Sequence, residues 1–365
     1  MVTSQEISIL IPTLNRSGFL ERTLKYYDLL KFEGKILIGD SSSGNHASKN
    51  LQTVNRYKKH LDLELIECPK PDPKDKADWI GFSGEAIAFK KLLRQVNTEF
   101  VVTSGDDDFL IPQSLLECAE ALDKHTGYSG FCGGRLDFQV SNDLDTGEVT
   151  YVKHIPYYAI DSDKGVDRWK TYAEHAISPL YSVIRTQDWL EVYEHFDRVS
   201  LRYIGSEFLP SALMVIRGKI GVLDRLMIIH QNQANRVLDW NKVSFYSMLI
   251  HPKWSQAINN LREIISTELV SKDSIAMDVA LDQFDSGFWK HFSGGLNSQY
   301  GSRYPANCVQ KNPVNFRTLL KLCLSIISTN NNDINANLLK SVLNPSNYYH
   351  QDFMPVFRLI TQSDE

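Results

Sequence analysis

Cysteine is scarce in this chain of 365 residues, and no C-x-x-C pair occurs. The five cysteines are widely spaced, at Cys68, Cys118, Cys132, Cys308 and Cys323. Zinc sites and disulfide frameworks are recognised by paired or regularly spaced cysteines. Their absence argues against both kinds of site, and we predict reduced thiols packed in the core.

Positive charge and long apolar runs are lacking too. The formal net charge is -5, which argues against nucleic acid as the main partner because a phosphate backbone needs a basic footprint. No apolar stretch approaches the ~20 residues of a membrane span, and no signal peptide is visible. We therefore expect no transmembrane segment and a cytoplasmic protein, either free or peripheral at a membrane.

Two glycine-rich phosphate loops are missing as well. Neither GxGxxG nor GxxxxGK[ST] occurs in the first hundred residues. These loops let the backbone approach the phosphates of dinucleotides and nucleoside triphosphates. Their absence weighs against a dehydrogenase and against a P-loop enzyme.

Short apolar runs alternate with helical patterns in the first third of the chain. The runs are Ile7–Ile11, Lys35–Gly39, Leu63–Ile66 and Phe100–Thr103. Uninterrupted apolar strands separated by amphipathic helices indicate an α/β fold with a mainly parallel sheet covered on both faces. Ligands of such sheets bind beyond the carboxyl ends of the strands.

The pattern changes further along the chain. We predict an α/β domain over residues 1–240, with a nucleotide-binding half at 1–127 and an acceptor-side half at 128–240. Helical patterns dominate the region 241–365. Two roles stay open for that region: it shapes the acceptor site, or it mediates homo-oligomerisation.

Three consecutive aspartates, Asp106, Asp107 and Asp108, follow the fourth apolar run. Adjacent carboxylates repel one another, so a fold tolerates them only with compensation. Residues i and i+2 of an extended segment face the same side, which allows Asp106 and Asp108 to act on one cation. Mg²⁺ and Mn²⁺ prefer such oxygen ligands. The alternative is that Asp108 caps the helix near Pro112 and its neighbours are solvated.

Polar residues also follow the first two strands. Asp40 can accept hydrogen bonds from a ribose hydroxyl or a base N–H, or it is simply a turn aspartate. Thr13 and Asn15 lie near a predicted helix N-terminus, which favours phosphate or nucleotide polar groups. Arg16 is either a phosphate contact or a surface charge.

Several segments together resemble the family 2 glycosyltransferases. They are Ile7–Arg16, Ile36–Ser43, Phe100–Leu110, and Gly205–Leu209 followed by Arg217 and Gly218. The resemblance extends over roughly residues 5–235. It implies a GT-A-type fold: a Rossmann-like, mixed but mainly parallel sheet flanked by helices, here followed by the helical C-terminal region.

The resemblance also implies a site. The residues expected around a nucleotide sugar are Pro12, Thr13, Asn15, Arg16, Asp40, Ser42, Asp106 and Asp107. The residues expected at a Mn²⁺ or Mg²⁺ ion are Asp108, His230 and Asp106. The triplet leaves open which two of its three aspartates form the DxD pair. His230 is alternatively a core or surface histidine.

The implied activity is that of an inverting glycosyltransferase. It moves a sugar from a nucleoside diphosphate sugar to a hydroxyl of a carbohydrate or glycoconjugate acceptor, with Glu207 as general base. The family's usual pair of carboxylates is Ser206-Glu207 here, so Glu207 is alternatively an ordinary charged residue. No QxxRW motif occurs, which argues against a processive synthase. Two other functions stay open: a sugar-phosphate nucleotidyltransferase, and a non-catalytic scaffold that binds a sugar nucleotide or carbohydrate.

Overall fold

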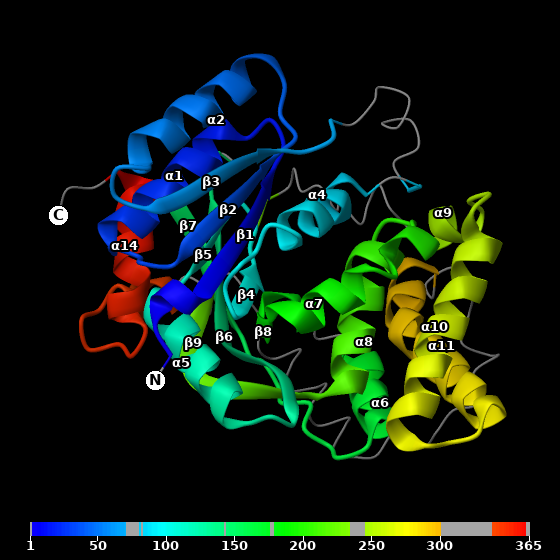
Figure 1. Ribbon diagram of the computed structural model, residues 1–365. Helices are drawn as coiled ribbons and strands as arrows, with labels where there is room; N and C mark the ends of the chain where they lie inside the picture. The colour runs from blue at the N-terminus through cyan, green and yellow to red at the C-terminus, as the bar shows by residue number, and fades with distance from the viewer. Residues whose placement is uncertain are drawn as a thin grey trace.

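The centre of the protein is a nine-stranded sheet in the order β3-β2-β1-β4-β8-β6-β9-β5, with β7 paired to β6 (Figure 1). The computed structural model describes residues 2–70, 80–81, 83–141, 144–175, 179–233, 245–300 and 338–362. The strands are β1 Ile7–Thr13, β2 Lys35–Asp40, β3 Asp62–Glu67, β4 Phe100–Thr103, β5 Asp108–Leu110, β6 Tyr128–Val140, β7 Val149–Ile155, β8 Val183–Arg185 and β9 Lys219–Gln231.

Parallel pairing joins β1, β2, β3 and β4, and also joins β6 to β9. Strands β5, β7 and β8 run antiparallel to their neighbours. The residues of Ile9–Ile11 and Ile36–Ile38 are fully buried, because helices cover both faces of the parallel strands. The predicted mixed sheet is confirmed, although β1 continues one residue past Pro12 to Thr13.

Helices surround this sheet. They are α1 Ser17–Leu29, α2 Gly44–Tyr57, α4 Gly84–Leu93, α5 Pro112–Lys124, α6 Gly165–His175, α7 Thr186–Tyr193, α8 Leu209–Arg217, α9 Phe245–Leu249, α10 Trp254–Asp273, α11 Met277–Tyr300 and α14 His350–Thr361. Four short turns, Ser4–Glu6 (η1), Pro179–Tyr181 (η2), Phe196–Arg198 (η3) and the π-helical Ile204–Phe208 (η4), complete the elements. Helix α4 packs on β1 and β2, whereas α5 packs on β6, β8 and β9.

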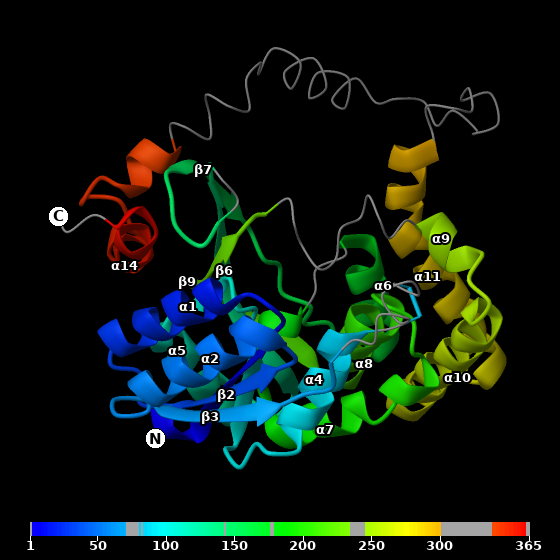
Figure 2. The ribbon, with the colours of Figure 1, turned by 90° about the horizontal axis from the view of Figure 1, so that it is seen from above.

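The helical elements after the sheet separate into two groups. Helices α9, α10 and α11, which we call the C-terminal lobe, lie beside α6 and α8 in both views (Figures 1 and 2). Helix α14 instead returns to the sheet and packs against α1, β7 and β9. The predicted boundary at residue 240 lies outside the described residues. In the part of the chain that the structure describes, no helix has the length and apolarity needed to cross a bilayer.

The free cysteines agree with the prediction of core thiols where the structure describes them. Cys68, Cys118 and Cys132 are all buried and unpaired. Burial raises the pKa of the Cys132 thiol to about 12, so this group is a poor nucleophile at neutral pH. Cys308 and Cys323 lie outside the described residues.

Trp169 of α6 forms the junction with the C-terminal lobe. Its fully buried indole stacks on Phe284 of α11, with ring centroids 6.2 Å apart. Its Nε1–H donates to the carbonyl of Gln283 at 2.9 Å. Gly287 stands where the indole lies against α11, and a Cβ there would overlap the ring. The lobe is therefore attached by a close fit, which needs a glycine in the middle of a helix.

We expect Gly287→Ala to destabilise the protein by about 1–3 kcal/mol, because overpacking against a fully buried ring outweighs the gain in helix propensity. Thermal or urea unfolding measures the change. Gly127→Ala is the matched control, since a Cβ at that position meets no atom within 4 Å. Equal stability of the two variants would contradict the close fit.

Candidate functional site

The aspartate triplet lies where the turn after β4 meets the carboxyl end of β9. The turn begins at Ser104, whose N–H donates to Leu10 of β1 at 2.9 Å. Asp108 opens β5 and stands opposite His230 in the antiparallel pairing with β9. A Cβ on Gly105 would lie 2.5 Å from an oxygen of Asp107 and 2.9 Å from one of Asp108. Glycine therefore provides the space in which the carboxylates gather.

Asp106 points toward the end of β1 and is 3% exposed. Its carboxylate accepts a hydrogen bond from the Thr13 hydroxyl at 2.7 Å and pairs with the Arg16 guanidinium at 2.8 Å. Burial raises the pKa of Asp106 to about 7, even though Arg16 and Thr13 favour its charged form. Ionised Asp106 therefore depends on nearby positive charge.

Asp108 points the other way, toward β9, and is 1% exposed. It pairs with Nδ1 of His230 and accepts a hydrogen bond from the Tyr181 hydroxyl at 3.0 Å. Burial alone would raise its pKa, but the charge and hydrogen bond of His230 hold that pKa at about 2. The same contact raises the pKa of His230 against the effect of burial. The predicted alternative of Asp108 as a helix cap is wrong, because Ile111 precedes α5.

Asp107 is the most exposed of the three carboxylates, with 16% of its side chain open. It pairs with Arg16 at 3.0 Å and accepts from Gln233 Nε2 at 2.9 Å. Arg16 also stacks over Phe19, 4.1 Å from the ring centroid. One guanidinium thus bridges Asp106 and Asp107. Arg16 is therefore not a simple surface charge, the second of the two alternatives considered for it.

The ends of β1 and β2 are joined by a polar network beside this cluster. The N–H of Asn15, whose backbone has a positive φ of 56°, donates to the Ser42 hydroxyl at 2.7 Å. The N–H of Ser42 donates to Asp40 at 2.8 Å. That contact is the bond expected of a turn aspartate, and Asp40 is 7% exposed. Pro12 lies one residue before Thr13, in register with Gly39.

Glu207 belongs to a second cluster. It lies in the π-helical turn η4 and is partly buried. Burial, and next the neighbouring charge of Glu85, raise the pKa of Glu207 to about 7, whereas Arg202 opposes the shift. Arg202 pairs with Glu85 at 3.3 Å. A carboxylate with a pKa near neutrality suits proton transfer.

The short turn η2 stands between the two clusters. It packs against β4 and β6 on one side and against α8 on the other. Tyr181, its last residue, contacts Asp108, and α8 continues directly from η4, the turn that carries Glu207. Turn η2 therefore contacts the acidic triplet through Tyr181, and it also packs on α8, the helix that follows the turn of Glu207.

Some residues near the triplet have no counterpart among those predicted from the sequence. Arg135 and Asp137 of β6 form a bidentate pair at 2.5 and 3.1 Å. Asp137 is the register partner of His230 in the parallel pairing of β6 and β9. Arg135 and Asp137 are two residues apart on one strand and so lie on the same face, and this spacing was the sequence signal that could have predicted their pairing. Glu85 and Tyr181 carried no comparable signal, because both reach their partners only through tertiary packing.

Asp108 and His230 are the side chains that could contribute ligands to a divalent cation bound together with substrate phosphates. Within the described ranges, no group of three or more His, Cys, Asp or Glu side chains is arranged to hold a metal. Asp108 and His230 nevertheless offer a carboxylate oxygen and an imidazole nitrogen in direct contact. Mg²⁺ or Mn²⁺ sites commonly combine one or two protein ligands with substrate phosphates and water.

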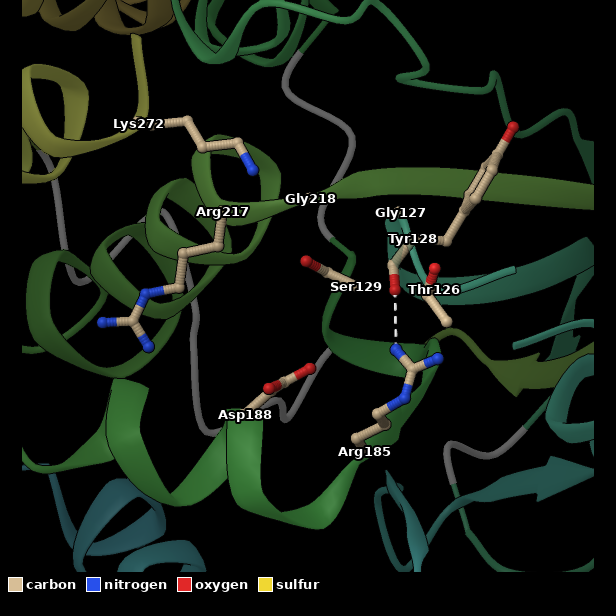
Figure 3. Close-up of a pocket in the computed structure, with 9 residues that line it drawn as sticks. All are labelled: Thr126, Gly127, Tyr128, Ser129, Arg185, Asp188, Arg217, Gly218 and Lys272. Atoms are coloured by element: carbon tan, nitrogen blue, oxygen red, sulfur yellow. Dashed lines mark hydrogen bonds between the residues drawn. The ribbon is translucent and has the colours of Figure 1, made fainter. Parts of the chain in front are cut away.

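A cavity of about 360 Å³ lies at the amino-terminal ends of β6 and β9, away from the strand ends that carry the triplet (Figure 3). Its lining includes Tyr128 at the start of β6 and Arg185 at the end of β8, and Arg185 donates to the Tyr128 carbonyl at 2.8 Å. Arg217, also in the lining, is neutralised by Glu268 at 3.1 Å. Because the parallel strands begin here, this cavity is remote from Asp108 and His230 at the end of β9.

Comparison with known proteins supports the fold. No family model and no curated protein matches the sequence. The crystal structure of residues 1–349 of S. aureus TarS in complex with UDP-GlcNAc superposes with a TM-score of 0.52 at 16% identity, covering 98% of this chain and 90% of that one. The mannosyltransferase PcManGT from Pyrobaculum calidifontis, in complex with GDP-Man and Mn²⁺, gives 0.40 at 12% identity over 90% of this chain and 82% of that one. The first superposition assigns the chain a GT-A-type fold.

We expect Arg16→Gln to lower stability by about 2 kcal/mol or more, because it leaves two adjacent carboxylates without their shared cation. Arg56→Gln is the control, since it breaks an exposed Arg–Glu pair with side chains 61% and 45% open; such pairs contribute about 0–1 kcal/mol. Chemical denaturation of both variants measures the difference. A loss at Arg16 no larger than at Arg56 would contradict the bridging role.

Proposed function

We propose that this protein is a glycosyltransferase that uses a nucleoside diphosphate sugar as donor and inverts the anomeric configuration. The observation that carries the proposal is the meeting of Asp106 and Asp108 with Arg16 and His230 at one sheet edge. Acidic and basic groups from three chain segments gather where ligands of parallel sheets bind. A GT-A-type fold alone would be compatible with other activities.

The donor nucleotide is assigned to the ends of β1 and β2. Thr13, Asn15, Asp40 and Ser42 line that edge, and Asn15 and Ser42 already share a hydrogen bond. The superposed TarS structure holds UDP-GlcNAc, which supports a nucleoside diphosphate sugar as the ligand class. Arg16 lies between this edge and the triplet, where its guanidinium can turn from Asp107 to a phosphate oxygen.

Asp108 and His230 would hold the divalent cation, Mn²⁺ or Mg²⁺. The ion would neutralise charge on the departing diphosphate. Asp106 would hold the ribose or a ligand of the ion. Tyr181 orients Asp108 through its hydroxyl, so the carboxylate keeps one direction in the absence of ligand. Asp106 and Asp108 are our choice for the DxD pair, in separate roles because Asp106 turns toward β1 and Asp108 toward β9. Asp107 pairs with Arg16 and Gln233.

Glu207 would accept the proton of the acceptor hydroxyl at its carboxylate. Inverting transfer is a single displacement, in which the acceptor oxygen attacks as the bond to the diphosphate breaks and the proton leaves to a base. A pKa of about 7 lets Glu207 be ionised at neutral pH and still bind a proton. Glu85 supplies in space the second carboxylate that is missing beside Glu207 in the sequence.

We expect Asp108→Asn to abolish metal-dependent binding of a nucleoside diphosphate, because it removes the charged one of the two proposed ligands of the ion. Calorimetric titration with UDP or GDP in the presence of Mn²⁺ measures the loss. Asp28→Asn is the matched control, since Asp28 forms a surface pair with His60 at 3.1 Å. Undiminished affinity in the Asp108 variant would exclude Asp108 as a ligand.

We expect Glu207→Gln to retain donor binding and to lower kcat by roughly 10² or more, as for loss of a general base. In the wild type, kcat should fall as pH drops below about 7, where Glu207 gains its proton. Folding stability has the opposite pH dependence, because the pKa of Glu207 is higher in the native state than in the unfolded chain. The native state is favoured at a pH below the unfolded-state pKa, and this contribution to stability is lost as the pH rises through about 7. The variant should therefore unfold at a higher temperature than wild type at pH 8, but not at pH 4.

Steady-state kinetics with a panel of sugar nucleotides, alongside Glu263→Gln as a surface control, tests the transfer. Full turnover in the Glu207 variant would remove Glu207 from the mechanism. Nucleotide binding without turnover by the wild type would favour the scaffold alternative.

A further inference from the structure

The turn that carries Glu207 has an unusual backbone. Tyr203, just before η4, has φ 65° and ψ -54°, a strained region that bulky side chains rarely adopt. Two residues later, a Cβ on Gly205 would overlap the carbonyl oxygen of Val199. The turn itself is π-helical, and such turns occur frequently at functional sites.

The backbone of Tyr203 holds Glu207 directly. Its carbonyl accepts hydrogen bonds from the N–H of Glu207 at 3.0 Å and of Phe208 at 2.8 Å. Its own N–H donates to the Ser206 hydroxyl at 3.0 Å. The direction of the Glu207 side chain therefore depends on Tyr203 keeping its strained conformation.

The side chain of Tyr203 is held from the C-terminal lobe. Its hydroxyl shares a hydrogen bond of 2.7 Å with Nε2 of His291 on α11. The two rings stack with centroids 6.2 Å apart, and His291 also meets the edge of Phe208 at 4.8 Å and the ring of Tyr172 at 5.4 Å. Burial lowers the pKa of His291 to about 4, so the imidazole is neutral at pH 7 and its unprotonated nitrogen can accept the hydrogen bond of the Tyr203 hydroxyl.

We propose that the Tyr203–His291 hydrogen bond is a positioning device for Glu207, and that the C-terminal lobe thereby takes part in the transfer reaction. This inference rests on the proposed function, because it assumes that Glu207 is the base. Tyr203 and His291 are positioning residues, since neither is assigned contact with donor or acceptor. The views of the whole chain agree with this arrangement, as α11 lies along α6 beside α8 (Figures 1 and 2).

Several other groups lie near Glu207, but only two of them, Glu85 and Arg202, affect its pKa; the two tyrosines are neutral. Glu85 comes from α4, Arg202 from the preceding loop, Tyr172 from α6 and Tyr193 from α7. None of them is changed by removing the Tyr203 hydroxyl. A looser turn would let water reach Glu207, which weakens the burial that raises its pKa.

The experiment compares four variants in the full-length protein. Tyr203→Phe and His291→Leu remove the hydrogen bond, and His291→Gln keeps an acceptor at the same reach. Tyr193→Phe is the matched control, because the Tyr193 hydroxyl is buried without a hydrogen-bond partner among the described residues. Each variant is measured for kcat, donor KM, the pH profile of kcat, and hydrogen exchange of the peptide that contains the Glu207 and Phe208 amides.

The proposal predicts that Tyr203→Phe and His291→Leu lower kcat by roughly 10-fold to 10²-fold, the effect of misplacing a catalytic group. Donor KM should stay unchanged, and the acid limb of the pH profile should move to lower pH. The two amides should exchange faster. His291→Gln should restore most of kcat, and Tyr193→Phe should resemble wild type.

Suppose that Glu207→Gln is inactive while Tyr203→Phe and His291→Leu keep the wild-type kcat and pH profile. That outcome would overturn the positioning role and leave the proposed function intact. A loss as large in Tyr193→Phe would also overturn it. If Glu207→Gln is fully active, the proposed base fails, and hydrogen exchange alone decides: unchanged protection of the two amides in Tyr203→Phe would overturn the proposed link.

Discussion

Three successive carboxylates at the edge of a buried sheet repel one another, and this repulsion governs the arrangement around them. Two of them lie almost entirely out of water, so each requires a partner from elsewhere in the chain. Asp106 pairs with Arg16, which follows β1, and Asp108 pairs with His230 near the end of β9. The sheet order makes both partners available, because β1 adjoins β4 and β9 adjoins β5.

The second cluster obeys the same electrostatics with a different outcome. Glu207 and Glu85 are both partly buried, and Arg202 is the cation near both among the residues that the structure describes. One positive charge cannot fully compensate two carboxylates, so the pKa of Glu207 rises to about 7, whereas His230 holds the pKa of Asp108 at about 2. Asp106, which shares Arg16 with Asp107, also has its pKa raised to about 7. The contrast therefore lies between Asp108, which stays charged beside its own cationic partner, and carboxylates that share one cation and can exchange a proton near neutral pH.

Local patterns predicted the parallel half of the sheet and the position of the triplet, because apolar runs followed by polar residues report strand ends directly. The same patterns could not reveal that Arg16 bridges Asp106 and Asp107, since that contact spans about ninety residues of chain. Nor could they pair Glu85 with Glu207, or Tyr181 with Asp108, because each contact is created by packing. Helix α14 illustrates the same limit: the sequence predicted a mainly helical region 241–365 but not that one of its helices returns to cover the sheet.

The return of α14 to α1, β7 and β9 makes the sheet domain discontinuous in sequence. Residues 2–233 need 338–362 to complete their surface, and the C-terminal lobe is an insertion between the two. The lobe itself is held through its contacts with α6 and α8. Shortening this chain from its C-terminus would therefore first expose the surfaces of α1, β7 and β9 that α14 covers, where Phe353 and Val356 are fully buried, before it reached the inserted helices.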